Sequence, residues 1–231
     1  MLTNAEWEAV RLTMFVSAVA VLCTIPIAIG MGWMVAKYRF PGKSFLEVLI
    51  NLPLVLPPVA TGYLLLIAMS RNGIVGRFLE SNLGVRLVFD WKGAALASAV
   101  VGVPLMVRPI RLAFEQVDDR LMHAARTLGA TRWDAFWSIA LPLARPGILA
   151  GCVLAFARSV GEFGATIMIA GNIPGETQTM SLLIYSAMDA PGGARMSFRM
   201  VVVAIIIAAI ALLASDLILR RERERHGRGA V

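Results

Sequence analysis

The residues with the clearest chemical potential are Arg158 and Glu162, which stand four positions apart in a largely apolar stretch. On a helix this spacing places both side chains on one face, where they form an ion pair that lowers the cost of charge in apolar surroundings. Two interpretations follow. Either Arg158 attracts an anion while Glu162 keeps it from binding too tightly, or the pair holds its helix against the neighbouring ones.

Three prolines, Pro53, Pro57 and Pro58, interrupt a second apolar stretch. Each removes a backbone N–H donor, so the carbonyls that it leaves unpaired must be satisfied by protein or by water. A break of this kind is typical of a helix beside a pore, and also of a kink that serves packing alone. We therefore treat these prolines, with Arg158 and Glu162, as candidate residues of a translocation pathway or gate.

The sequence lacks motifs of catalysis and metal binding. His123 and His226 are the only histidines, and Cys23 and Cys152 lie in separate apolar segments, so these residues do not form a metal cluster. There is no phosphate-binding GxxxxGK[ST] loop and no nucleophile elbow. We predict no metal, no cofactor and no enzymatic activity; nucleotide hydrolysis, where it is needed, must come from a partner.

The composition indicates an all-α integral membrane protein. Of 231 residues, 58% are hydrophobic and only 16% are charged, and the mean hydropathy is +0.73, which is more apolar side chain than a soluble domain of this size could bury. The net charge of +7 accumulates beside apolar runs. It is therefore interpreted as a determinant of membrane topology and not as a nucleic-acid surface.

Five segments are long enough to cross a hydrocarbon core of ~30 Å, at about 11–37, 46–70, 92–114, 138–160 and 199–219. An apolar patch at 180–188 is too short and is predicted to lie at the membrane surface or to fold back into the protein. Placing 37–43, 108–145 and the tail on one side gives that side fourteen Lys and Arg against seven, Arg158 excluded. The N-terminus is then outside and the C-terminus cytoplasmic. We predict one membrane domain, 8–219, and a charged cytoplasmic tail, 220–231.

A cytoplasmic segment, 115–137, links the third and fourth spans and is amphipathic. Asp118 is predicted to cap a first short helix, and Gly129 to end that helix with a positive φ. Thr131 and Asp134 have the spacing of a capping box that opens the next helix. The prediction is a helix, a glycine turn, a second helix and then a span.

This segment resembles the coupling loop of ABC importer permeases, whose pattern is Glu-Ala-Ala, three residues, Gly, nine residues, Ile, one residue, Leu-Pro. The matching positions are Ala124, Ala125, Gly129, Ile139, Leu141 and Pro142, and His123 replaces the family's glutamate. The resemblance implies that the loop docks in a groove of a separate ATPase subunit and transmits its closure to the membrane helices. The charge contact made by that glutamate is in doubt here.

The resemblance extends from about 7 to 225 and is closest to the molybdate permeases, through RFPGK at 39–43, NLPLVLPPVATGYLLL at 51–66, LAFARSVGEFGAT at 154–166 and NIPGET at 172–177. It implies the type I ABC importer permease fold (MetI-like) in the bacterial cytoplasmic, or inner, membrane. The implied partners are two ATPase copies, a second copy of this chain, membrane lipid and a periplasmic or surface-anchored molybdate-binding protein.

Other functions remain open at this point. A permease for sulfate, thiosulfate or tungstate belongs to the same class, because nothing in the composition or spacing identifies molybdenum. An ion-driven carrier, or an intramembrane enzyme that uses Arg158 and Glu162, belongs to a different class. A carrier typically contains inverted repeats, and no internal repeat is apparent in the sequence.

Overall fold

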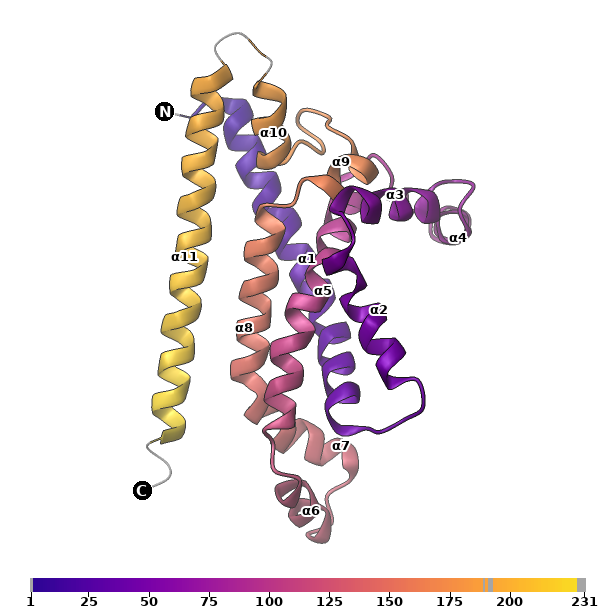
Figure 1. Ribbon diagram of the computed structural model, residues 1–231, viewed down its shortest axis with the longest axis vertical. Helices are drawn as coiled ribbons and strands as arrows, with labels where there is room; N and C mark the ends of the chain where they lie inside the picture. Colours follow the sequence, from indigo (N-terminus) through magenta and orange to yellow (C-terminus); the bar gives the residue numbers. More distant parts are fainter. Residues whose placement is uncertain (1, 189, 191–192, 228–231) are drawn as a thin grey trace.

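The chain folds into a bundle of helices, which Figure 1 shows with its long axis vertical. This computed structural model describes the backbone of residues 2–188, 190 and 193–227, and side chains up to 217 except 189, 191, 192 and 215. Its elements are α1 (Asn4–Lys37), α2 (Lys43–Val55), α3 (Pro58–Met69), α4 (Ile74–Leu83), α5 (Trp91–Glu115), α6 (Asp119–Thr127), α7 (Arg132–Ala135), the π-helical turn η1 (Phe136–Ala140), α8 (Leu141–Val160), α9 (Gly164–Ala170), α10 (Met180–Ala187) and α11 (Gly193–Gly227).

The membrane-spanning architecture predicted from the sequence is confirmed. Among the described residues, four helices are long and apolar enough to cross a membrane, and the bent pair α2–α3 makes a fifth if it counts as one span. The chain begins at one end of the bundle and α11 ends at the other, the end that also carries α6 and α7, as an odd number of crossings requires (Figure 1). The side chains of the predicted tail, 220–231, lie outside the described residues.

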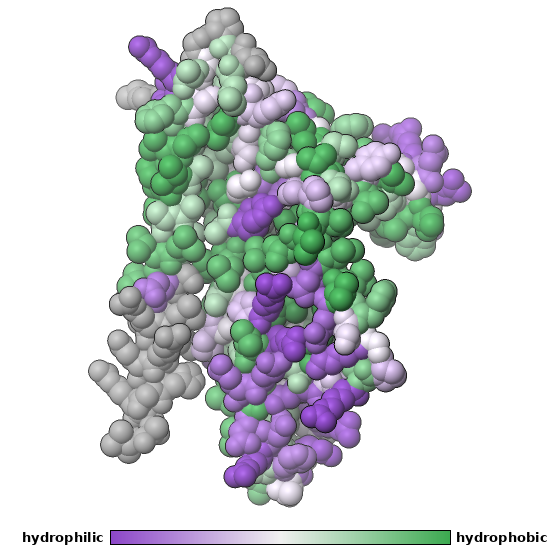
Figure 2. Space-filling model, in the orientation of Figure 1, coloured by the Kyte–Doolittle hydropathy of each residue, from purple (hydrophilic) through white to green (hydrophobic). Residues whose placement is uncertain are grey.

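The distribution of polar side chains agrees with a membrane protein. Figure 2 shows hydrophobic side chains over most of the upper and middle part of the visible face. Hydrophilic side chains gather at the lower end, around α6 and α7. We therefore treat this lower end as the cytoplasmic one, since it carries the basic connecting segment between α5 and α8.

The core lies where α5 packs between α1 and α8. Met106, Ile110 and Phe114 of α5 are fully buried there. Close approach depends on glycine: a Cβ on Gly151 of α8 would lie 2.8 Å from the carbonyl oxygen of Met106. Small residues at such crossings allow two backbones to pack directly, which is the usual basis of helix association in a bilayer.

The second predicted span, 46–70, is two helices in the structure, not one. α2 and α3 meet at an angle of 112°. Leu56 has an extended conformation (φ −65°, ψ 142°) because a residue before proline is disfavoured in the helical region, and Pro58 begins α3 without needing an N–H donor. The prolines therefore turn the chain sharply within the bundle.

The end of the chain is fastened to its beginning. Thr3 and Glu6 form a capping box at the start of α1, and Glu6, fully buried, also forms an ion pair of 2.8 Å with Arg199 of α11. The short helix predicted near 180–188 is α10, which folds back into the protein: its first N–H, at Met180, donates to Thr13 Oγ1 at 2.8 Å. These contacts close the outer end of the bundle.

The packing of α3 on α9 makes a prediction about Gly62. A Cβ at this position would lie 2.6 Å from both the Cα and the carbonyl oxygen of Ala165, and backbone atoms there have little room to shift. We expect Gly62→Ala to destabilise the fold by about 2 kcal/mol through overpacking, measured as a lower thermal unfolding temperature of the purified protein in detergent.

The matched control is Gly102→Ala, at another buried helical glycine. Its Cβ would meet only Ala155, whose Cβ would lie at an ordinary 3.5 Å, so the better helix propensity of alanine should leave stability equal or higher. A Gly62→Ala protein as stable as the Gly102→Ala protein would contradict the tight α3–α9 contact.

Candidate coupling segment and translocation pathway

The segment between α5 and α8 has the local structure that the sequence predicts. Asp118 caps α6 by accepting a hydrogen bond from the Arg120 N–H at 2.9 Å. Gly129 has φ +93°. Thr131 and Asp134 form the predicted capping box: the Asp134 N–H donates to Thr131 Oγ1 at 3.1 Å, and the Thr131 N–H to Asp134 Oδ2 at 3.0 Å. Caps, turn and second helix are thus confirmed.

The predicted coupling residues occupy one continuous path from the surface into the bundle. His123, Ala124 and Gly129 are exposed, whereas Ala125, Ile139, Leu141 and Pro142 are partly buried. His123, Ala124 and Ala125 lie on α6, and Gly129 follows that helix. Ile139 is in η1, and Leu141 and Pro142 begin α8. A protein that docks on α6 would therefore press on a segment that leads, through α7 and η1, into the membrane-spanning helix α8.

A π-helical turn joins the segment to α8. The Leu141 N–H donates to the carbonyl of Phe136, five residues earlier. Pro142 has no N–H to donate to Ser138, which interrupts the α-helical pattern at this point. Turns of this type are frequent at functional sites. Pro142 was predicted only as a position of the motif, and this local widening of the helix was not predicted.

Two residues of α1, both outside the motif, tie the segment to the rest of the bundle. Lys37, the last residue of α1, donates to the Val117 carbonyl at 2.7 Å and lies 2.6 Å from Asp119 Oδ1. Trp33 of α1 packs edge-on against Phe136 of η1 and Phe114 of α5, each with ring centroids 5.1 Å apart. These links are between residues distant in sequence, so pattern reasoning had no signal for them.

The two groups of candidate pathway residues are the Arg158–Glu162 pair and the prolines of the α2–α3 bend, and they come together at the outer end of α8. Arg158 Nη1 lies 2.6 Å from Glu162 Oε2, which confirms the predicted ion pair. The Glu162 side chain is 2% exposed, and its Oε1 accepts a hydrogen bond from the Ala165 N–H at 2.8 Å. It therefore holds the start of α9 as well as the arginine.

The helix that Glu162 holds lies directly against the bend between α2 and α3. A Cβ on Gly164 would be 2.9 Å from the Cβ of Pro58. Pro57 and Pro58 thus belong to the same region as the ion pair, whereas Pro53 lies inside α2. The Arg158 side chain, 32% exposed, still reaches the surface of the single chain. This geometry suits an Arg158 guanidinium that contacts an anion while the buried Glu162 carboxylate holds it in place.

A second polar group lies nearer the cytoplasmic end, on α2 and α5. Arg108 Nε donates to Asn51 Oδ1 at 2.9 Å, and Arg111 contacts Glu47 at 3.1 Å and Glu115 at 2.7 Å. These bonds fix α2 beside α5 below the bend. Within the part of the chain that the structure describes, no group of three or more His, Cys, Asp or Glu side chains could hold a metal ion.

Comparison with known proteins decides the family. The profile of the family described as binding-protein-dependent transport system inner membrane component matches residues 11–224. The chain belongs to this family. As a member, it is an inner-membrane component of a transport system, which confirms the predicted localisation.

Relatives within the family are similar over nearly the whole length. The chain is 51% identical over 227 residues to the molybdenum transport system permease protein ModB of Escherichia coli strain K12, covering 98% of this chain and 99% of that protein. It is 49% identical to the protein of the same name from Haemophilus influenzae, with the same coverage. The sulfate transport system permease protein CysT of Escherichia coli K12 is 37% identical, over 80% of this chain and 66% of its own.

Solved structures support the fold alone, because their sequence identity is low. A bacterial alginate ABC transporter, solved with a periplasmic protein bound to an alginate pentasaccharide, has a TM-score of 0.74 at 19% identity, covering 95% of this chain and 80% of that one. An inward-facing structure of the MetNI methionine ABC transporter has a TM-score of 0.65 at 17% identity, covering 94% of each chain. The type I importer fold predicted from the sequence is confirmed.

Proposed function

We propose that this chain is the membrane-spanning permease of an ATP-driven molybdate importer. Membership of the family is established above, and relatives at 51% and 49% identity over nearly their whole length are molybdenum transport permeases by name. The chain supplies the path and not the hydrolysis. ATP hydrolysis is assigned to a separate ATPase subunit, two copies of which act on the importer.

One structural observation carries the coupling part of this proposal. α6 and α7 protrude at the cytoplasmic end of the bundle, away from the apolar middle part (Figures 1 and 2). The start of each helix is fixed by a side-chain cap, and the glycine turn between the helices is closed by a hydrogen bond from the Ala130 N–H to the Ala125 carbonyl. An exposed pair of capped helices that leads into α8 suits a lever, that is, a segment through which a cytoplasmic partner moves a membrane-spanning helix.

The mechanism follows from the contacts of the lever. Closure of two ATPase subunits moves α6 inward, and the salt bridge of Lys37 with Asp119 together with the Trp33–Phe136 packing passes that movement to α1. η1 passes it to α8, whose other end carries Arg158 and Glu162 beside the bend. The outer gate then opens and admits the anion. Affinity along the path stays weak, since strong binding would slow release.

Two further partners complete the importer. A second copy of the chain forms the other wall of the path, because one set of five spans encloses too little volume and two-fold pairing is the common symmetry. An extracytoplasmic molybdate-binding protein releases the anion over the outer connections, 71–91 and 161–199. The exposed apolar face of α11 remains for lipid, which agrees with the small buried share of its span, 6%.

A different oxyanion is the alternative cargo. The sulfate permease CysT is 37% identical over 80% of this chain, so sulfate or thiosulfate, and the close molybdate analogue tungstate, are the competitors to test. The higher identity and fuller coverage of the molybdenum permeases favour molybdate.

Uptake of radiolabelled molybdate tests the proposal directly. The chain is expressed, with its ATPase and binding protein, in cells that lack their own molybdate permease. We expect vanadate to inhibit uptake of the labelled molybdate. Excess unlabelled molybdate or tungstate should compete with it, whereas excess sulfate should leave uptake largely intact. Sulfate competition as strong as that of molybdate would transfer the assignment to a sulfate permease. Loss of uptake on adding a protonophore at constant ATP would contradict an ATP-driven importer.

A further inference from the structure

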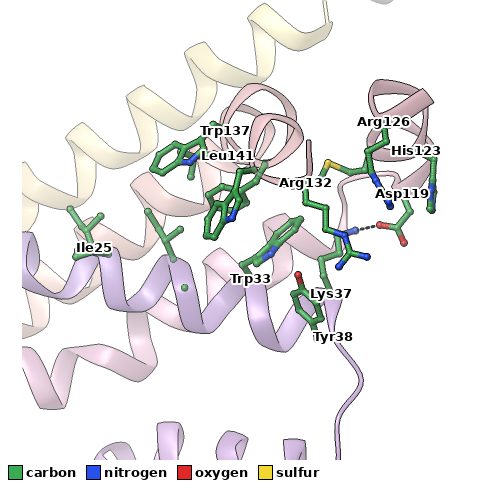
Figure 3. Close-up of a pocket in the computed structure, with 16 residues that line it drawn as sticks. Ile25, Trp33, Lys37, Tyr38, Asp119, His123, Arg126, Arg132, Trp137 and Leu141 are labelled. Atoms are coloured by element: carbon green, nitrogen blue, oxygen red, sulfur yellow. Dashed lines mark hydrogen bonds and ion pairs between the residues drawn. The ribbon is translucent and has the colours of Figure 1, made fainter. Parts of the chain in front are cut away.

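A cavity of about 870 Å³ lies between α1 and the coupling segment. One wall is the cytoplasmic half of α1, and the other is formed by α6, α7, η1 and the first residue of α8. Figure 3 shows side chains of both walls facing the space between them. Its volume is in the range of sites that hold one small molecule.

The lining changes in character along the cavity. Toward the middle of the bundle it is apolar and includes Ile25, Ile29 and Leu141. Trp33 and Trp137 line its central part. Aromatic side chains of this type are favoured where hydrocarbon meets the head groups of a bilayer. The cavity is therefore apolar at the depth of the membrane.

At the cytoplasmic end the lining becomes basic. Lys37, Arg126 and Arg132 contribute three cations against the single carboxylate of Asp119, a difference of +2. Lys37 is already paired with Asp119. Arg126 and Arg132 are exposed, and among the described side chains neither has a carboxylate within salt-bridge distance. Two arginines are thus available to an anion at this mouth.

The combination selects one kind of occupant. A small soluble anion would satisfy Arg126 and Arg132 and leave the apolar part without a partner. A neutral hydrocarbon would fill the apolar part and leave the arginines uncompensated. A phospholipid with an anionic head group matches both parts, in the order in which a membrane presents them, with the phosphate at the basic end and the acyl chain along Ile25 and Ile29.

We propose that this cavity binds one anionic phospholipid of the inner leaflet, with the head-group phosphate held by Arg126 and Arg132. The lipid contacts α1 on one side and the coupling segment on the other. It therefore adds a bridge between them, besides the Lys37–Asp119 pair, at a position distinct from the translocation pathway.

Tryptophan fluorescence provides the test, because Trp33, Trp133 and Trp137 line the cavity. The full-length protein is placed in phosphatidylcholine vesicles that contain increasing amounts of phosphatidylglycerol with brominated acyl chains, or of phosphatidylcholine brominated at the same carbons. We expect quenching to report about tenfold tighter binding of phosphatidylglycerol, since each cation near an anionic head group adds severalfold affinity. Equal quenching by the two lipids in the unmodified protein would overturn the proposal.

The arginines are tested with a variant of matched charge. Arg126→Gln with Arg132→Gln should lower the preference for phosphatidylglycerol to less than twofold. Arg120→Gln with Arg145→Gln removes two exposed cations that do not line the cavity, and it should keep the tenfold preference. If this control variant loses the preference to the same extent, the effect comes from general surface charge and the site is rejected.

A soluble anion is the remaining alternative. Inorganic phosphate in excess, at constant ionic strength, should leave the quenching by phosphatidylglycerol unchanged, because phosphate alone gains nothing from the apolar part. If inorganic phosphate abolishes the lipid preference, the arginines form a site for a soluble anion and the lipid assignment is wrong.

Discussion

Replacing Gly129 with valine is expected to lower molybdate uptake at least tenfold while the protein remains in the membrane at normal abundance. Gly129 has φ +93°, a conformation in which a β-branched side chain costs roughly 1–3 kcal/mol. The turn is also bonded tightly to α6, since the N–H of Ala130 donates to the Ala125 carbonyl at 3.0 Å. Relief of the strain must therefore re-aim α6 relative to α7. Uptake and immunoblotting of membranes measure the two quantities.

Gly42→Val is the control for backbone strain. Gly42 has φ +87°, lies in the cytoplasmic loop before α2 and, like Gly129, would have no atom within 4 Å of an added Cβ. The two substitutions therefore impose similar strain at exposed turns, but only one turn belongs to the coupling segment. We expect Gly42→Val to keep uptake near the normal level and Gly129→Val to lose most of it. Equal uptake by both variants would show that the geometry of the α6–α7 turn does not govern transport.

Local structure was the part of this protein that its sequence predicted well. The caps at Asp118 and Thr131 and the turn at Gly129 depend on interactions between residues no more than five positions apart. Such interactions are fixed by residue type and spacing, whatever the tertiary fold. The same holds for the ion pair of Arg158 and Glu162, which needs only one helical turn. Hydropathy likewise located the spans, because a hydrocarbon solvent demands long apolar helices.

The bend and the outer helices were harder to predict. The prolines at 57 and 58 indicated a break, but no local rule gives the 112° angle, which depends on α9 packing against α3 through Gly62 and Gly164. α4 was not predicted at all. Its signal was present as glycines on both sides: Gly73 precedes it, and Gly84 ends it with φ +63°. Its ten residues are of mixed polarity and lie between two spans, so the hydropathy of the sequence did not indicate a helix there.

Contacts distant in sequence could not be inferred from one chain. Lys37 and Asp119 are 82 positions apart and Glu6 and Arg199 are 193 apart, so nothing in the spacing of either pair indicates contact. The proposed transmission of movement from α6 to α1 uses the first of these pairs, together with Trp33 and Phe136. The candidate pathway shows the same limit. Pro58 and Glu162 were each selected separately, and only the fold places them on either side of the start of α9.

The ion pair of Arg158 and Glu162 gives the second large expected effect, because one partner is buried. Arg158→Gln leaves the Glu162 carboxylate, 2% exposed, without its cation, which should destabilise the protein by about 3 kcal/mol. Glu162→Gln should cost less, about 1 kcal/mol, since its amide oxygen still accepts from the Ala165 N–H and Arg158 reaches solvent. Thermal unfolding of the purified variants measures the difference. We also expect Arg158→Gln to lower molybdate uptake at least tenfold.

The double variant, Arg158→Gln with Glu162→Gln, separates a role in transport from a role in packing. Two amides in place of the charges leave no uncompensated carboxylate, so most of the lost stability should return. Uptake should stay low, because the cation that meets the anion is still missing. A double variant that recovers both stability and uptake would show that the pair only fastens α8 to α9. Other residues would then have to form the pathway, and the first candidate is Arg108, which donates to Asn51 on the cytoplasmic side of the bend.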